Sequence, residues 1–499
     1  MLGATYLPMP TPTDLANLDR CAHRVYLDVA GDPAEKLPAS AFLELLWESG
    51  LLHEDRIIAA LGAVDAKVSD DKTVRIAETR RLMAEGTPLI YHAYFELGDL
   101  RGEPDLLERV EHPSTLGAYA YIPADIKNAT VFEKRKVPTP KEKYLLQLCA
   151  YAELLEDAQG WWPETGKIID AQGTPNVLDL AGYRPTYEEN RQRLAHIRNG
   201  EERTFPGWKG ECDNCQWQAV CIRALEEMDD VTLVGGVGES YRAKLATIGV
   251  RTASDLADAD PAALRQLKGI GASFSTAWVR QAKAQKRGTP EILDLWAPPD
   301  VAFEISYDIE DFTPGPFLYL HGLLIREKGA RKFGDEGFTE ADWGRFEPLC
   351  ATLPDDTEEA LWRRFLVMVA EFEKRGHYAV YIYSHHEKTN LEKLTAKYGG
   401  SIELDHFIGR FVDLLPVVKR CVVFPTDSTS LKPLARFVGF DWRDTDPGGS
   451  QSMAWWAEYI DDPVDKAALR ERVIAYNEDD VRATFALRDW LAKHCRLGP

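Results

Sequence analysis

Val301-Ala-Phe-Glu-Ile-Ser-Tyr-Asp-Ile-Glu310 is the segment from which the fold of the carboxy-terminal part of this chain can be predicted. Its apolar residues predict a β-strand that ends in Asp308 and Glu310. Residues two apart on a strand point to the same face, so these carboxylates are expected side by side. Strand patterns follow at 317–326 and 378–383, and helical patterns at 360–374 and 466–493. This alternation predicts an α/β layer fold.

Further acidic positions follow downstream of this strand. In Tyr476-Asn-Glu-Asp-Asp480, Tyr476 and Asp480 are four apart and share one face of the final predicted helix. Glu387 lies where a strand pattern passes into a helix. Together these carboxylates could hold two divalent ions for in-line phosphodiester cleavage, with Tyr476 orienting the attacking water. Each motif alone is common in proteins without such a site, and the ordered set is the stronger signal.

About residues 300–495 resemble the DnaQ-like exonucleases of the RNase H-like superfamily, in their tyrosine-containing variety, and are closest to the YprB-like branch. The resemblance implies that Asp308 and Glu310 form the first motif and that Tyr476 and Asp480 form the third. The second motif usually has Asp, and Glu387 is the matching residue here.

Two other positions of this region enter through the same resemblance. Asp413, in Phe411-Val-Asp-Leu-Leu415, is an alternative ligand to Glu387. Ser430-Leu-Lys432 also resembles the YprB-like branch, and Lys432 is expected to touch the substrate.

The amino-terminal part carries a second set of polar residues. Residues 88–110 predict two strands with a turn near Gly98-Asp99, the second strand containing Asp105. A further strand runs through Asp125 to Lys127, which share one face. Two carboxylates can hold divalent ions, and a lysine can orient water or stabilise the charged transition state. The set is completed by Gln147 and Tyr151, four apart on a predicted helix, and by His53 as an additional metal ligand.

About residues 10–225 resemble the RecB-like branch of the PD-(D/E)XK nucleases. The resemblance includes the opening Thr13-Asp-Leu15, Cys21 and Arg24-Val-Tyr-Leu27. It implies a restriction-endonuclease-like domain whose active-site positions are His53, Asp105, Asp125, Lys127, Gln147 and Tyr151. The carboxylate before the lysine is Asp here rather than Glu, which the RecB branch tolerates.

Cysteines are grouped near the end of the same part. Cys212, Cys215 and Cys221 form a C-x2-C-x5-C pattern, and Cys21 is the best candidate for a fourth ligand. Thiolates at this spacing predict a soft-metal site. In the resembled nucleases, one upstream and three downstream cysteines bind a [4Fe–4S] cluster, which four thiolates suit. The alternatives are a zinc site of three cysteines with a histidine such as His23, and no bound metal.

The segment 231–290 has a net positive charge, whereas the chain as a whole is negatively charged. It contains nine Lys or Arg and four Asp or Glu, whereas the whole chain has a net charge of −21. It resembles a tandem helix-hairpin-helix module, a small all-α domain. The glycines of its two hairpins, which would expose backbone amides to phosphate, and the basic residues beside them are Gly236, Gly238, Lys268, Gly269, Gly271 and Arg280. The alternatives are a helical linker and a protein-binding version of the fold.

These observations predict an α/β multidomain protein. The domains are 1–228, a RecB-like nuclease domain with four cysteines; 229–290, the tandem helix-hairpin-helix; and 300–499, the RNase H-like domain. The start resembles no secretory signal, no apolar run is long enough to cross a membrane, and we expect a cytoplasmic protein.

The expected function is a Mg²⁺- or Mn²⁺-dependent DNA exonuclease or flap-processing nuclease in DNA repair, recombination or defence. The chain has no G-x4-G-K-[ST] phosphate loop, so any unwinding would come from a helicase partner. Two alternatives stay open: an adaptor that binds DNA ends with one or both sites silent, and an RNA-processing exonuclease.

Overall fold

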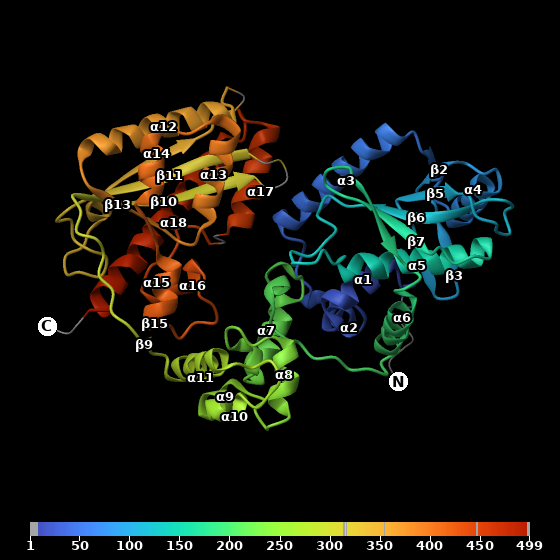
Figure 1. Ribbon diagram of the computed structural model, residues 1–499, viewed down its shortest axis with the longest axis horizontal. Coiled ribbons are helices and arrows are strands. Elements are labelled where there is room, and N and C mark those ends of the chain that lie inside the picture. The colour runs from blue at the N-terminus through green and yellow to red at the C-terminus, as the bar shows by residue number, and fades with distance from the viewer. Residues whose placement is uncertain (1–7, 313–314, 316, 354, 446–447, 497–499) are drawn as a thin grey trace. The chain divides into compact units, whose positions relative to one another are not determined.

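The structure is a computed structural model that describes residues 8–312, 315, 317–353, 355–445 and 448–496. Its chain contacts define two compact units, each with its own sheet (Figure 1). Unit 1 comprises the residues up to Pro206 together with Gly210–Arg223. Unit 2 comprises Gly207–Lys209 and the residues from Ala224 onward.

Unit 1 is built on a six-stranded mixed sheet of order β1-β2-β5-β6-β7-β8. Pairs β1·β2 and β6·β7 are parallel and the others are antiparallel. The strands are β1 (Val64–Asp65), β2 (Leu89–Tyr91), β5 (Leu106–Val110), β6 (Ala120–Ile126), β7 (Thr165–Ile169) and β8 (Pro175–Asp179). All seven residues of β6 are buried, as expected for a strand with both faces covered.

Helix α5 (Glu142–Gln159) packs on β6 and supplies nine buried residues to the core of unit 1. It ends at Gly160, whose φ of 68° is the left-handed conformation that glycine adopts without strain. The opposite face of the sheet carries a smaller apolar cluster, in which Ile57 and Ile58 of α3 (Ala41–Leu61) pack against Ala124 and Ile126.

The segment with three cysteines folds back onto the start of unit 1. Gln216 exchanges hydrogen bonds with the backbone of Leu37, and the Trp217 indole donates to Asp28. The other helices of unit 1 are α1 (Pro12–Arg20), α2 (Ala22–Ala30), η1 (Pro33–Glu35), α4 (Lys72–Ala84), α6 (Arg184–Arg198) and η2 (Gly210–Asn214); α7 (Gln218–Glu227) crosses into unit 2.

The sequence expectation for residues 88–110 is wrong in detail. This segment forms four short strands instead of two, because β3 (Phe95–Leu97) and β4 (Leu100–Gly102) make a separate hairpin. The turn at Gly98-Asp99 is confirmed, with Gly98 at φ 58°. Asp105 lies just before β5 and Lys127 just after β6, so neither residue is inside a strand.

Unit 2 contains a five-stranded sheet of order β12-β11-β10-β13-β14. Its strands are β10 (Phe303–Phe312), β11 (Phe317–Glu327), β12 (Arg345–Cys350), β13 (Tyr378–Ile382) and β14 (Phe411–Asp413). Along β10, Ile305, Tyr307 and Ile309 enter an apolar core with α12 (Glu358–Arg375). The alternate residues face α18 (Ala467–His494), and these include Asp308 and Glu310.

The helices of unit 2 cover both faces of this sheet (Figure 1). Besides α12 and α18, the sheet domain of unit 2 contains η4 (Glu340–Trp343), α13 (His386–Tyr398), α14 (Ile402–Gly409), α15 (Leu414–Cys421), α16 (Leu431–Phe437) and α17 (Gly449–Asp461). The strand and helix expectations for residues 301–493 are therefore confirmed, with ends that differ by a few residues.

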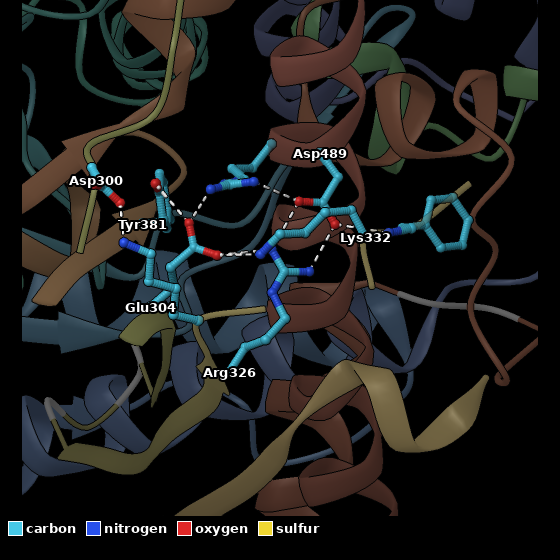
Figure 2. Close-up of polar contacts among 9 residues, drawn as sticks. Asp300, Glu304, Arg326, Lys332, Tyr381 and Asp489 are labelled. Carbon is cyan, nitrogen blue, oxygen red and sulfur yellow. Dashed lines mark hydrogen bonds and ion pairs between the residues drawn. The ribbon is translucent and has the colours of Figure 1, made fainter. Parts of the chain in front are cut away.

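A buried ion network fixes the amino-terminal end of β10 to α18 (Figure 2). Arg326 makes a bidentate pair with Asp489 at 2.7 and 2.8 Å, and its second amino group lies 3.2 Å from Glu304. Lys332 donates to Glu304 at 2.9 Å, and Arg488 pairs with both Glu304 and Asp489. Three cations thus share two buried carboxylates, which explains why the pKa of Glu304 is lowered although burial alone would raise it.

The segment that follows α7 forms a small helical module within unit 2. Its helices are η3 (Val231–Leu233), α8 (Glu239–Ala246), α9 (Ala253–Asp258), α10 (Pro261–Leu264) and α11 (Ala272–Arg287). Leu245, Leu256, Leu264 and Trp278 are among the residues of its own core. The short strands β9 (Glu291–Ile292) and β15 (Val422–Val423) pair and join this module to the larger sheet domain.

Candidate functional site

Three carboxylates converge on the α18 side of the sheet in unit 2. Asp308 and Glu310 come from β10 and Asp480 from α18, and one oxygen of each lies within 4.8 Å of the others. The two strand residues share a face because they are two apart, as the sequence predicts. Within the described ranges, no other group of three or more acidic, histidine or cysteine ligand atoms is as close.

The electrostatics of this cluster oppose its ionisation. Burial raises the pKa of Asp308 well above its usual value, and the charges of Asp480, Glu310 and Glu387 raise it further. Burial and Asp480 also raise the pKa of Glu310, to about 8, although Ser452, Asn477 and Lys432 partly offset them. Like charges held together away from water are stable when a bound cation neutralises them, which is how metal-binding carboxylates behave.

Tyr476 and Lys432 complete one side of this cluster. The Lys432 ammonium donates to the Tyr476 hydroxyl at 3.1 Å, and a hydrogen bond links Tyr476 to Asp480. The indole of Trp442 donates to Asp480 at 2.8 Å. The predicted neighbours Tyr476 and Asp480 are thus brought together with a lysine that the sequence places 44 residues earlier.

Glu387 also reaches the cluster. It lies in the first turn of α13, is buried and is close enough to Asp308 for its charge to raise the pKa of that carboxyl. Burial raises its pKa to about 7. Asp413, the alternative ligand, instead accepts the backbone amides of Ser384 and Leu415, both at 2.9 Å, and so caps α15. The geometry therefore favours Glu387 over Asp413 as the fourth carboxylate.

Sequence reasoning missed the residues that hold these carboxylates in place. Asn477 donates to Asp308 at 2.7 Å, and Ser452 hydrogen-bonds to Glu310 and to Tyr319. Asn477 could have been found from the sequence because it directly follows Tyr476, a residue already predicted for the site. Trp442 lies in a loop 38 residues before Asp480, and no local pattern points to it.

In unit 1 the structure brings together five of the six predicted residues. Lys127 lies 2.7 Å from Asp125 and 3.7 Å from Asp105. Gln147 donates to the Tyr151 hydroxyl at 3.3 Å, and Tyr151 is near enough for Asp125 and Asp105 to raise its pKa, after burial. Burial and Asp125 raise the pKa of Asp105 well above its usual value, so this pair also has the character of a cation-binding site.

The sixth residue, His53, has other partners. Its Nε2 lies 3.0 Å from the carbonyl of Asp170, and its Nδ1 lies 2.8 Å from Arg56. The residue of this helix whose charge reaches Asp105 is Glu54, which adds to the raised pKa of Asp105 and accepts from Tyr91 at 2.8 Å. The role of His53 as a metal ligand stays a prediction, and Glu54 is the neighbour that the sequence reasoning missed.

The four predicted cluster cysteines all belong to unit 1, and the other three lie within electrostatic reach of Cys221. Burial raises the pKa of the Cys221 thiol to about 12, and the charges of Cys215, Cys21 and Cys212 raise it further. Cys21 is the N-cap of α2 and accepts the Arg24 amide. The fold therefore brings Cys21 and Cys212, which are 191 positions apart in the sequence, into the same part of unit 1.

The predicted hairpin glycines lie where the helices of the small module begin. Gly238 precedes α8 and Gly271 precedes α11, and Gly236 and Gly269 adopt φ of 87° and 89°. Arg280 lies on the exposed side of α11, 3.7 Å from Glu291. Lys244 donates to the carbonyl of Lys268 at 2.9 Å, which ties the two hairpins together.

Comparison with known families matches two segments of unit 2. Residues 337–492 match the RNase_H superfamily. Unit 2 contains an RNase H superfamily domain. The match spans Glu387, Lys432, Tyr476 and Asp480 of the RNase H domain and begins after β10 and β11. Residues 228–284 match the SAM-like helix-hairpin-helix tandem, so the small module is a helix-hairpin-helix domain. No curated protein matches the chain.

These two domains are compatible with a nuclease that acts on nucleic acid. The RNase H-like fold typically uses Mg²⁺ or Mn²⁺, and the acidic cluster of the RNase H domain offers the oxygen ligands that such ions prefer. Among the residues that the structure describes, no helix is both long and apolar enough to span a bilayer.

Proposed function

We propose that this protein is a metal-dependent nuclease that hydrolyses phosphodiester bonds of DNA at the carboxylate cluster of its RNase H domain. The observation that carries the proposal is the convergence of Asp308, Glu310 and Asp480 within 4.8 Å. Divalent ions bound there would lower the pKa of a coordinated water and neutralise charge on the phosphate. Glu387 extends the set to four carboxylates, because it is close enough for its charge to raise the pKa of Asp308.

The surrounding side chains of the RNase H domain have positioning roles in this proposal. Asn477 fixes Asp308, and Trp442 fixes one oxygen of Asp480. Tyr476 lies between Asp480 and Lys432, so its hydroxyl can hold the attacking water against the carboxylates. Preorganised groups of this kind avoid the cost of reorganising the site during the reaction.

We further propose that unit 1 is a RecB-like PD-(D/E)XK nuclease domain with a second active site. Its metal ligands would be Asp105 and Asp125, with Glu54 or His53 nearby. Lys127 stays protonated because Asp125 and Asp105 raise its pKa against the opposing effect of burial. The Lys127 ammonium, held between these two carboxylates, could contact the scissile phosphate when nucleic acid binds.

A basic segment beside this site supports nucleic acid as its substrate. Residues 127–143 contain six Lys or Arg and two Glu, in a chain with a net charge of −21. Lys134, Arg135 and Lys136 are exposed. Burial and the nearby charges of Arg20, Lys141 and Lys127 lower the pKa of Lys143 to about 8. Concentrated positive charge attracts a phosphate backbone.

The four cysteines of unit 1 are proposed to bind a [4Fe–4S] cluster, with zinc as the alternative. Their residue types and proximity fit four-thiolate ligation. The ligands would join the start of unit 1 to the segment 210–223, which already packs there through Gln216 and Trp217. Such a site restricts the unfolded chain and couples folding to metal binding.

The whole arrangement is proposed as three domains, 1–228, 229–290 and 300–499, in a cytoplasmic enzyme of DNA repair, recombination or defence. The helix-hairpin-helix domain would grip the DNA backbone through its hairpin amides, and a helicase would supply single strands. RNA as substrate, and a DNA-end adaptor with silent sites, are the alternatives that the assay below separates.

The test uses end-labelled single-stranded DNA and RNA with Mn²⁺ and three variants, Asp308→Ala, Lys127→Ala and the combination. We expect wild type to degrade DNA, each single variant to lose one part of the activity, and the combination to lose all of it. If wild type degrades RNA but not DNA, the protein is an RNA-processing exonuclease and the proposal that it acts on DNA fails. No degradation by wild type, with retained DNA binding, would favour the adaptor.

A further inference from the structure

A loop of the RNase H domain is held by the helix-hairpin-helix domain. This loop, residues 424–430, connects β15 to α16. The side-chain amide of Gln281, on α11, donates to the carbonyls of Phe424 and Thr426 at 2.8 and 2.7 Å. Gln285, one turn later on α11, donates to the carbonyls of Thr426 and Leu233, both at 3.2 Å. Both glutamines thus bind the backbone of one loop.

The same loop leads directly to the catalytic cluster. Two residues after it, Lys432 lies in the first turn of α16 and donates to Tyr476. The loop is anchored at its start by the ring of Phe424, which packs 4.9 Å from Trp490, and near its end by Tyr383, which donates to the carbonyl of Thr429. The glutamines hold the stretch between these anchors.

The first hairpin contacts this loop. A Cβ added at Gly235 would lie 3.0 Å from the carbonyl of Asp427. Glu239, which begins α8, lies 3.6 Å from Lys209. A Cβ added at Gly238 of the first hairpin, or at Gly271 of the second, would meet nothing within 4 Å, and Phe274 is 53% exposed. The loop therefore contacts the first hairpin at Gly235 and leaves the last glycine of each hairpin open.

Helix α11 joins the second hairpin to the loop. It begins after Gly271 and reaches Gln281 after about 15 Å, at 1.5 Å per residue. One helix thus connects the second hairpin with the loop that precedes Lys432.

We propose that Gln281 and Gln285 are positioning residues for the RNase H site. By fixing loop 424–430 they place the Lys432 ammonium on the Tyr476 hydroxyl, and so the helix-hairpin-helix domain completes the nuclease site as well as gripping nucleic acid. This inference rests on the proposed activity of the RNase H domain. Removing the amide donors leaves three carbonyls without these partners, and a carboxylate at the same place would repel them.

The test uses Gln281→Glu/Gln285→Glu in a protein whose first site is silenced by Asp105→Ala/Lys127→Ala. We expect kcat on end-labelled single-stranded DNA to fall about 10-fold with KM changed by less than about 2-fold, since misplacing a group at the site affects mainly the chemical step. Gln266→Glu adds one of these charges at an exposed position of the same domain and should leave kcat unchanged.

Two further measurements decide whether the glutamines act through Lys432. In a Lys432→Ala background, the double glutamine change should lower kcat no further, because coupled residues are not additive. Hydrogen exchange of the backbone amides in 426–433 should accelerate in the double variant and not in Gln266→Glu. Full kcat, a raised KM alone, an additive loss in the Lys432→Ala background, or unchanged exchange would each overturn the proposal.

The exchange measurement also separates this inference from the proposed function. If the silenced protein has no activity that Asp308→Ala removes, the proposed function of the RNase H domain fails. Exchange in 426–433 then still reports whether the glutamines fix the loop, and unchanged exchange would defeat the inference independently.

Discussion

The side-chain amide of Asn477 donates to Asp308 across 2.7 Å, although the two residues are 169 positions apart. This approach is possible because Gly322 is paired with Asp308 in the β10–β11 register. A Cβ at Gly322 would lie 1.6 Å from Asn477 Oδ1. The absence of one side chain on β11 therefore decides how a carboxylate on β10 is oriented.

Gly322→Ala is expected to displace Asn477 and release Asp308. Overpacking of a close contact costs about 1–3 kcal/mol, so the free energy of unfolding should fall by that amount. Activity of the RNase H site, measured with the first site silenced, should fall about 10-fold because the metal-binding carboxylate is no longer fixed. Gly409→Ala, where a Cβ meets nothing within 4 Å, is the matched control. Equal behaviour of the two variants would contradict the argument.

Asp480→Asn should stabilise the metal-free protein. The Asp480 carboxylate is penalised by burial, and it raises the pKa of Asp308 and Glu310, so a neutral amide relieves the repulsion. We expect the Tm in EDTA to rise by about 2–4 °C, and the increase in Tm produced by Mn²⁺ to be smaller than in wild type. An unchanged response to Mn²⁺ would show that the cluster does not bind the ion.

Cys221→Ser should remove the bound metal of unit 1. Losing one of four thiolates is expected to abolish iron in anaerobically purified protein, measured by elemental analysis and visible absorption, and to lower the stability of unit 1. Cys149→Ala, a buried thiol on α5, should keep full metal content. Zinc instead of iron in the wild-type protein would favour the zinc site over the [4Fe–4S] cluster. The absence of both metals from the wild-type protein would refute the metal site.

Asp489→Asn should destabilise unit 2 strongly. It weakens the bidentate pair with Arg326, a guanidinium with no exposed side-chain surface. Breaking one partner of a buried ion pair costs about 3–5 kcal/mol, because a charge is left uncompensated. Asp300→Asn removes an exposed pair with Lys328 and should change the free energy of unfolding by less than about 1 kcal/mol. Chemical denaturation of both variants makes the comparison.

The same network predicts how stability depends on pH. The pKa of Glu304 is lowered because Arg488, Arg326 and Lys332 together outweigh the burial that would raise it. Its stabilising contribution is therefore complete above the unfolded-state pKa of about 4.3 and is lost as pH falls through the lower folded-state value. In Glu304→Gln, the free energy of unfolding should therefore depend less on pH below about pH 5 than in wild type. Glu327→Gln, which changes an exposed pair with Arg375, should leave this pH dependence unchanged.

Part of the RNase H site could be predicted from the sequence. Asp308 and Glu310 share a face because strands repeat every two residues, and Tyr476 and Asp480 share a face because helices repeat every 3.6. Glu387 was predicted near the others because it lies where a strand pattern passes into a helix and because it matches the second motif of the resembled exonucleases. The strand pattern of residues 88–110 failed because short hairpin strands and sheet strands have the same local periodicity.

Local patterns in the amino-acid order were enough to predict which residue types lie on common faces, the alternation of strands and helices, and the C-x2-C-x5-C spacing. The folded chain was needed to show that Asn477 fits over Gly322, that Trp442 binds Asp480, that Glu54 lies near Asp105, and that Gln281 binds the loop before Lys432. This division arises because periodicity acts over one or two turns. Contacts across many residues depend on sheet register and on where a helix packs, which no local pattern specifies.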